Sequence, residues 1–299
     1  MPSPAVGVES RSPTTPIKTK TEKRVRLLSY EEIPEWYRDN ECIRSGYRPV
    51  SGSAWVSVLS WRYIHNETVN IFSHLLPAVA FLLGEGYILG YIQSEYPDAT
   101  ASDYFIFAFF LLAAFVCLGL STTYHTLLNH SHEVERQWLC LDFVGIVLLT
   151  LGDFISGIYM RKIYWSMICS LGALTIFIMV NPRFSGRKWR TFRTLTFVAT
   201  GLSGFAPLGH GVYLFGVPQM MLQSGMPYYL AEGGLLCLGA LVYATRFPEA
   251  LSPGRFDIWG ASHQIFHILV VFATAVQLIG LLAAFDYNYH SRICTDVLA

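Results

Sequence analysis

The stretch ASHQIFHILVVFATAVQLIGLLAAF, at residues 261–285, decides the fold class. After its second histidine, His267, it contains no charged residue. A helix needs about 20 predominantly apolar residues to cross the roughly 30 Å of hydrocarbon in a bilayer. The stretch therefore predicts a membrane-spanning helix over about 263–285, with His263 and His267 at its beginning.

The whole chain has the composition of a membrane protein. Of its 299 residues, 53% are hydrophobic and only 14% are charged, whereas a soluble domain is about 25% charged. Six further apolar stretches approach the length of a membrane span, and they lie at 70–92, 104–128, 139–160, 163–181, 194–216 and 228–246. We expect an all-α fold, a seven-transmembrane helix bundle, and hence a multi-pass integral membrane protein.

Four segments follow from these spans. Residues 1–24 are rich in Pro, Ser, Thr and Lys, which is typical of a disordered tail. Residues 25–69 mix aromatic and charged side chains, as a cytoplasmic and interfacial segment would. Residues 70–285 form the predicted bundle, and 286–299 form an outer C-terminal tail. The net charge is zero. We expect no nucleic-acid partner. The chain contains no C-x-x-C pair of the kind that would indicate a thiolate metal site.

The distribution of Lys and Arg predicts the orientation in the membrane. If the N-terminus lies inside, the inner segments hold eighteen Lys and Arg residues and the outer segments hold three. Positively charged loops stay on the cytoplasmic side. We therefore expect a cytoplasmic N-terminus and an extracellular C-terminus. This is the reverse of the arrangement in rhodopsin-like receptors, which argues against a G-protein-coupled receptor.

With that orientation, polar side chains from three distant spans reach the same depth. Ser121 and His125 lie near the inner end of the second span, Asp142 begins the third, and His263 and His267 begin the seventh. Ionisable groups inside a membrane are costly and usually have partners. Three imidazoles with a fourth position open are the ligand set of a catalytic Zn²⁺. We expect a zinc site, with Asp142 and Ser121 beside it.

A simpler interpretation stays open for each of these residues. The histidines lie near the inner boundary, where they would serve equally as hydrogen-bonded packing or interfacial residues. Asp142 would stabilise the N-terminus of its own helix. Ser121 would bond to a carbonyl of its own helix.

Four motifs also resemble a known family. They are RYIHNETVNIFSHLLPAV (62–79), STTYHTLLNHS (121–131), LDFVGI (141–146) and ASHQIFHILVV (261–271). In this order they resemble the progestin and adiponectin (adipoQ) receptor family, which is haemolysin-III-related. The resemblance implies a zinc held by His125, His263 and His267. It also implies that Ser121 and Asp142 surround a water next to the metal.

Two classes of function follow from these observations. The resemblance favours hydrolysis of a lipid amide, most concretely of ceramide to a sphingoid base and a fatty acid. Asp142 would then move the proton, and Ser121 would hold the water or the developing oxyanion. The alternative is a signalling receptor, or a protein of zinc or sterol homeostasis, in which zinc is structural and nothing is turned over. We expect membrane lipids and a ceramide-like ligand as partners. The resemblance favours the plasma membrane over an endomembrane, and the sequence does not indicate an oligomeric state.

Overall fold

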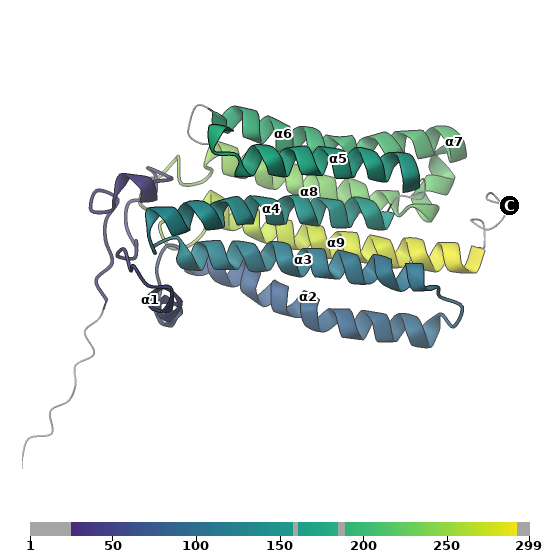
Figure 1. Ribbon diagram of the computed structural model, residues 1–299, viewed down its shortest axis with the longest axis horizontal. Coiled ribbons are helices and arrows are strands. Elements are labelled where there is room, and N and C mark those ends of the chain that lie inside the picture. Colours follow the sequence, from purple (N-terminus) through teal and green to yellow (C-terminus); the bar gives the residue numbers. More distant parts are fainter. Residues whose placement is uncertain (1–24, 158–160, 185–188, 292–299) are drawn as a thin grey trace, which may run out of the picture.

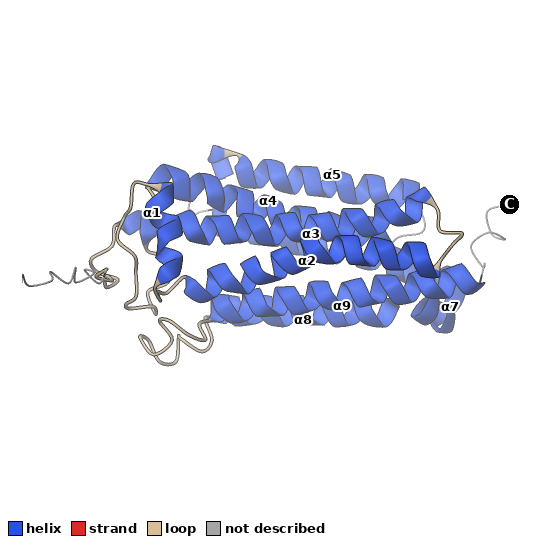
Figure 2. Ribbon diagram, turned by 90° about the horizontal axis from the view of Figure 1, so that it is seen from below, coloured by secondary structure: helices blue, strands red, loops and turns tan. Residues whose placement is uncertain are grey.

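The computed structural model describes residues 25–157, 161–184 and 189–291, and long helices make up most of them (Figure 2). Outside the helices, an isolated antiparallel bridge joins Leu28 and Tyr47. The all-α helical bundle is therefore confirmed. The predicted tail at 1–24 lies outside the described residues, as do residues 292–299 of the tail predicted at 286–299 and Arg187 and Lys188 of the charge count.

The helices run nearly side by side along the long axis (Figure 1). Their bounds are α1 Ala54–Leu59, α2 Thr68–Glu95, α3 Ala101–Leu127, α4 His132–Gly157, α5 Arg161–Val180, α6 Arg190–Ser203, α7 Phe205–Gln223, α8 Met226–Thr245 and α9 Ser262–Ser291. Short 3₁₀ turns lie at Glu35–Tyr37, Ser60–Arg62 and Pro182–Phe184. The purple start of the described chain and the end of α9 lie at opposite ends of the bundle, as an odd number of crossings requires (Figure 1).

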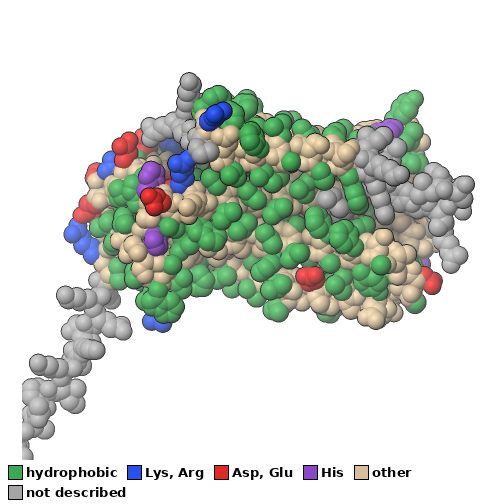
Figure 3. Space-filling view, in the orientation of Figure 1, with side chains coloured by type: hydrophobic (Ala, Val, Ile, Leu, Met, Phe, Trp, Pro, Cys, Tyr) green, Lys and Arg blue, Asp and Glu red, His purple; other side chains and the backbone are tan. Residues whose placement is uncertain are grey.

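Five of the described helices are long and apolar enough to cross a membrane, namely α2, α3, α4, α8 and α9. A sixth, α5, has a shorter apolar helix over Tyr164–Val180. Hydrophobic side chains cover the middle of the face in Figure 3, and most of its charged side chains gather at one end. The chain is a multi-pass membrane protein by this pattern, while the count of seven spans and the orientation stay predictions.

The predicted fifth span, 194–216, is built differently from a single straight helix. It is divided between α6 and α7, which meet at Gly204. A Cβ at Gly204 would overlap the ring of Phe154, so the junction lies directly against α4. Within α7 the backbone bends again at Gly216, whose φ of 77° and ψ of 160° are not helical. The last span also differs, since α9 continues past residue 285 to Ser291.

Small residues let neighbouring helices approach closely. On α4, a Cβ at Gly145 would lie 3.1 Å from the Cα of Cys117, and one at Gly152 would lie 2.9 Å from the Cβ of Ala113. Van der Waals contact between such faces is a main source of helix association in membranes. Because Gly145 is one turn from Asp142, this contact places the stretch of α4 around Asp142, ten residues past the start of the helix, against α3.

A layer of loops and short helices closes one end of the bundle. We call this layer the cap; it consists of residues 25–66 and the loop 246–261. A small apolar core of its own holds it together, made of Ile33, Tyr37, Ile43, Tyr47 and Ala261. Burial raises the pKa of the Tyr37 phenol to about 12. The cap corresponds to most of the predicted cytoplasmic and interfacial segment.

Candidate metal centre

Three histidines meet where the bundle joins the cap. His125, near the end of α3, and His263 and His267, in the first two turns of α9, each offer a ring nitrogen within 4.8 Å of the others. The Nε2 atoms of His125 and His263 are 3.2 Å apart. Zn–N bonds of about 2.0–2.1 Å in a tetrahedral site place two ligand nitrogens roughly 3.3 Å apart. The group could therefore hold a metal ion with little movement of its side chains.

Hydrogen bonds orient two of these rings toward a shared centre. His125 Nδ1 donates to Glu67 Oε2 at 2.8 Å, and His267 Nδ1 lies 3.2 Å from the carbonyl oxygen of Asn70. A ring that donates through Nδ1 keeps an unprotonated Nε2, which is the form that binds a metal. Partners of this kind fix the tautomer and increase the basicity of the ligand. The hydrogen bonds of these rings therefore favour a bound cation, as do the distances between the ring nitrogens.

Glu67 is a residue of the site that the sequence analysis did not assign. It lies just before α2 and is buried, and its Oε2 also accepts a 2.7 Å hydrogen bond from Asn70 Nδ2. Burial raises the pKa of Glu67, but the hydrogen bonds from His125 and Asn70 outweigh it and lower the pKa to about 2. A carboxylate that stays ionised beside His125 favours positive charge at the centre. Its signal was the HNET stretch at 65–68, in which a lone carboxylate lies just before the first span.

His74 is the second unassigned residue. Its ring stacks on His267, with centroids 3.8 Å apart and planes inclined by 5°. Its Nδ1 lies 2.8 Å from Ser121 Oγ, and Ser121 lies near enough to Asp142 to influence its carboxyl group. Ser121 therefore contacts an imidazole and lies beside a carboxyl group.

All five predicted residues thus lie in one place. The three histidines form the cluster, Ser121 is next to it, and Asp142 is close enough to His125 to interact with it electrostatically. The simpler interpretation of Ser121, a bond to its own helix carbonyl, is not what its contacts with His74 and Asp142 show. The roles of the five residues stay predictions.

The cap holds the two helices that carry the histidines. Arg48 is fully buried and donates to the carbonyls of His125 at 2.6 Å and Thr126 at 2.9 Å, at the C-terminal end of α3. Glu249, also fully buried, accepts from the backbone N–H of Ser262 at 2.8 Å, at the N-terminal end of α9. A cation at a helix C-terminus and an anion at an N-terminus both stabilise the helix. The positions of His125 and His263 therefore depend on the cap.

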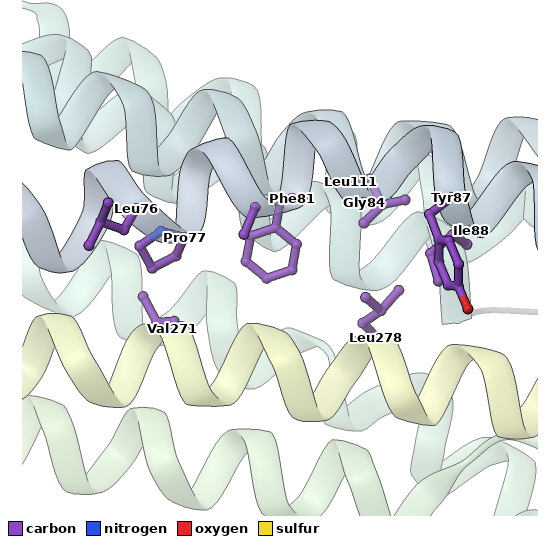
Figure 4. A pocket seen from close by; sticks show the side chains of 10 residues that line it. Leu76, Pro77, Phe81, Gly84, Tyr87, Ile88, Leu111, Val271 and Leu278 are labelled. Carbon is purple, nitrogen blue, oxygen red and sulfur yellow. The ribbon is translucent and has the colours of Figure 1, made fainter.

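An apolar pocket begins one turn from the histidines. It has a volume of about 530 Å³ and lies between α2, α3 and α9, where its walls include Leu76, Pro77, Phe81, Leu111, Val271 and Leu278 (Figure 4). Pro77 is three residues from His74 along α2, and Val271 is four residues from His267 along α9. Leu76 and Tyr87, on α2, are largely exposed at its edge. The pocket therefore begins about one turn from the polar centre and opens at the surface of the bundle.

The chain is similar to known proteins over most of its length. The family model described as Haemolysin-III related matches residues 62–278. The ADIPOR-like receptor IZH2 of Saccharomyces cerevisiae is 36% identical over 294 residues, which cover 94% of this chain and 91% of that protein. Human progestin and adipoQ receptor family member 3 is 31% identical, with 92% of this chain and 91% of that protein covered.

A longer relative shows the same likeness over a smaller share of its length. The progestin and adipoQ receptor-like protein 1 of Caenorhabditis elegans is 38% identical over 91% of this chain, which spans 64% of that protein. The matched residues include all three histidines of the centre. The chain therefore belongs to the haemolysin-III-related family of membrane proteins, among relatives named as adiponectin-type and progestin and adipoQ receptors.

Proposed function

We propose that the chain is a zinc-dependent hydrolase of a lipid amide, with ceramide as the concrete substrate. The observation that carries the proposal is the three-histidine cluster with Asp142 and Ser121 beside it, at the inner edge of an apolar pocket. Three imidazoles suit zinc and leave a fourth position for a reacting group. Zinc in such a site polarises a carbonyl and makes water nucleophilic near neutral pH.

Residues of the chain would then carry out proton transfer, stabilise the oxyanion and orient the imidazoles. Asp142 accepts a proton from the attacking water as the new C–O bond forms, and returns it to the amine nitrogen as the C–N bond breaks. Ser121, which contacts His74 and lies beside Asp142, donates a hydrogen bond to the water or to the oxyanion. Glu67 and Asn70 hold the imidazoles in their orientation. The products are a fatty acid and a sphingoid base.

The apolar pocket is the place for the acyl chain. Its walls are almost entirely hydrocarbon, and its inner edge is next to His74 and His267. An acyl chain lying between α2 and α9 would bring its polar linkage to the metal centre. This arrangement suits an amphipathic substrate taken from the membrane, and it supports membrane lipids as the partners of the chain.

The membrane setting is part of the proposal. The excess of Lys and Arg in the predicted inner segments favours a cytoplasmic N-terminus and an extracellular C-terminus. The opposite placement of the two described chain ends supports it (Figure 1). The cap would then lie in the cytoplasm, and the histidines would lie under the inner leaflet. The plasma membrane stays our preferred location, by family likeness.

The decisive variant is Asp142→Asn. We expect it to keep its metal and its fold while hydrolysis of ceramide falls by about 10²–10⁴-fold, since it loses the general acid and base. The measurement combines elemental analysis of the purified protein with ceramide turnover in mixed micelles. Asp98→Asn, which changes an exposed carboxylate between α2 and α3, is the matched control and should behave as wild type. A metal-loaded wild-type protein without turnover would contradict the hydrolase.

The second candidate function is a receptor in which the zinc is structural. Relatives named as receptors favour it, and so does the cap, whose bonds to α3 and α9 tie the metal centre to the predicted cytoplasmic surface. On this alternative, removing the metal with a chelator would change the accessibility of the cap to protease. Asp142→Asn would leave that change as it is in the wild type.

A further inference from the structure

The wall of the apolar pocket has a gap on α2. The α2 residues that line the pocket include Pro77, Phe81, Gly84 and Ile88 (Figure 4). Residues three and four apart lie on one face of a helix, so these four form a row that begins one turn beyond His74. Gly84 is the member of the row without a side chain. A Cβ added there would have no atom of a neighbouring helix within 4 Å, so the space in front of Gly84 is open.

The helices α2 and α9 contact each other on both sides of the pocket. At the inner end, the rings of His74 and His267 stack with centroids 3.8 Å apart. At the other end, the Tyr96 hydroxyl donates a hydrogen bond to Asp286 at 2.8 Å. The pocket residues of α2 and α9 all lie between these two contacts along the chain. An occupant of the pocket must therefore lie lengthwise between the two helices.

The length of the pocket matches one acyl chain. At a rise of about 1.5 Å per residue, Gly84 lies about 15 Å from His74 along α2, and Ile88 lies about 21 Å from it. The hydrocarbon of one leaflet is about 15 Å deep, which is half of the roughly 30 Å of a bilayer. The chain of an ordinary membrane lipid that begins at the metal centre would therefore end at about the position of Gly84. A much shorter chain would end before it.

The chemistry of the walls suits a hydrocarbon chain and no polar ligand. Apart from the Tyr87 hydroxyl at the edge, the side chains that line the pocket carry no polar group. A polar ligand would lose its hydrogen bonds to water there without replacing them. In a hydrophobic pocket, one methylene more or less changes discrimination between ligands by about 10–200-fold. The presence or absence of a side chain in the pocket wall is therefore enough to decide which chains fit.

We propose that Gly84 determines the acyl-chain length that the pocket accepts, by leaving room for the end of a long chain whose polar linkage lies at the metal centre. The inference rests on the proposed function for the kind of substrate, and it adds the residue that selects among substrates of different chain length. A side chain at this position would fill the space between Phe81 and Ile88 and exclude the far methylenes of a long chain. A short chain does not extend that far. The protein therefore favours long-chain lipids.

The test compares Gly84→Leu with Gly86→Leu in the full-length, metal-loaded protein. Gly86 lies on the same helix but does not line the pocket, and a Cβ there also has no atom of a neighbouring helix within 4 Å. Binding of octanoic, lauric and palmitic acid is measured in detergent by competition with radiolabelled palmitate. Gly84→Leu should lower the ratio of palmitate to octanoate affinity by about 10-fold or more. Gly86→Leu should keep the ratio of the wild type.

Turnover of ceramides that carry the same three acyl chains is measured in parallel. A wild type that binds palmitate but hydrolyses none of these ceramides contradicts the hydrolase, and the binding ratios then still decide the role of Gly84. An unchanged ratio in Gly84→Leu, an equal change in Gly86→Leu, or a wild type that binds palmitate no better than octanoate overturns the proposal. If Gly84→Leu does not fold, Gly84→Ala takes its place and should lower the ratio in the same direction.

Discussion

Replacing Glu67 with Gln is expected to weaken metal binding without displacing any ligand. The carboxylate accepts two hydrogen bonds, from His125 Nδ1 at 2.8 Å and from Asn70 Nδ2 at 2.7 Å. The amide keeps the size of the side chain but loses its negative charge, so the His125 imidazole becomes a weaker base. Loss of a partner of this kind costs about 10–100-fold in metal affinity. That is roughly 1.4–2.7 kcal/mol of binding free energy.

The assay is a competition between the purified protein and a zinc chelator of known affinity. Cobalt substitution adds a second readout, since its visible absorption reports whether the site keeps a tetrahedral geometry. Glu133→Gln, at an exposed position in the first turn of α4, is the matched control and should bind zinc as the wild type does. A Glu67→Gln protein that folds, keeps the cobalt spectrum and binds zinc with unchanged affinity would refute the reasoning.

Three further changes test how the cap and the bundle support the centre. Arg48→Met should lower the free energy of unfolding by about 1–3 kcal/mol, because the buried carbonyls at the end of α3 lose their donor; an unchanged thermal midpoint would contradict it. Burial, together with the charge of nearby Arg48, lowers the pKa of His65 from 6.5 to about 3. The neutral form of His65 therefore stabilises the fold above about pH 6.5, and this contribution to stability should fall as the pH drops toward 3. His65→Gln should flatten this part of the stability profile measured by thermal unfolding. Gly145→Val should lower the free energy of unfolding by about 1–3 kcal/mol, because it forces α4 away from Cys117. It should also reduce turnover by displacing Asp142. A variant with wild-type stability and turnover would exclude that contact.

The fold class and the histidine cluster were predictable because each depends on a local pattern. Apolar runs of span length are visible in the sequence, and alternation of direction assigns a depth to each helix end. This assignment of depth was sufficient to predict that His125 lies next to His263 and His267, although His125 and His263 are more than 130 positions apart in the sequence. The five residues chosen from depth and resemblance lie together in the structure.

The supporting residues were not predictable in the same way. Glu67 before α2 is the usual position of a carboxylate that stabilises a helix N-terminus, and only the fold shows that it binds His125. Arg48 and Glu249 act on helix ends far along the chain, which no local pattern records. At the junction of α6 and α7, Gly204 also contacts a distant residue, since Phe154 occupies the space that a side chain would need.

The apolar pocket has a consequence for how the protein meets its ligand. Leu76 and Tyr87, 65% and 75% exposed, lie on its rim along α2, at the flank of the bundle. A lipid substrate of the kind proposed above would reach the pocket by lateral diffusion within the bilayer, without dissolving in water. Occupancy is then set by the mole fraction of that lipid among its neighbours, so adding inert lipid lowers occupancy even when the bulk concentration of ligand is constant. Rates measured with this protein should follow surface dilution.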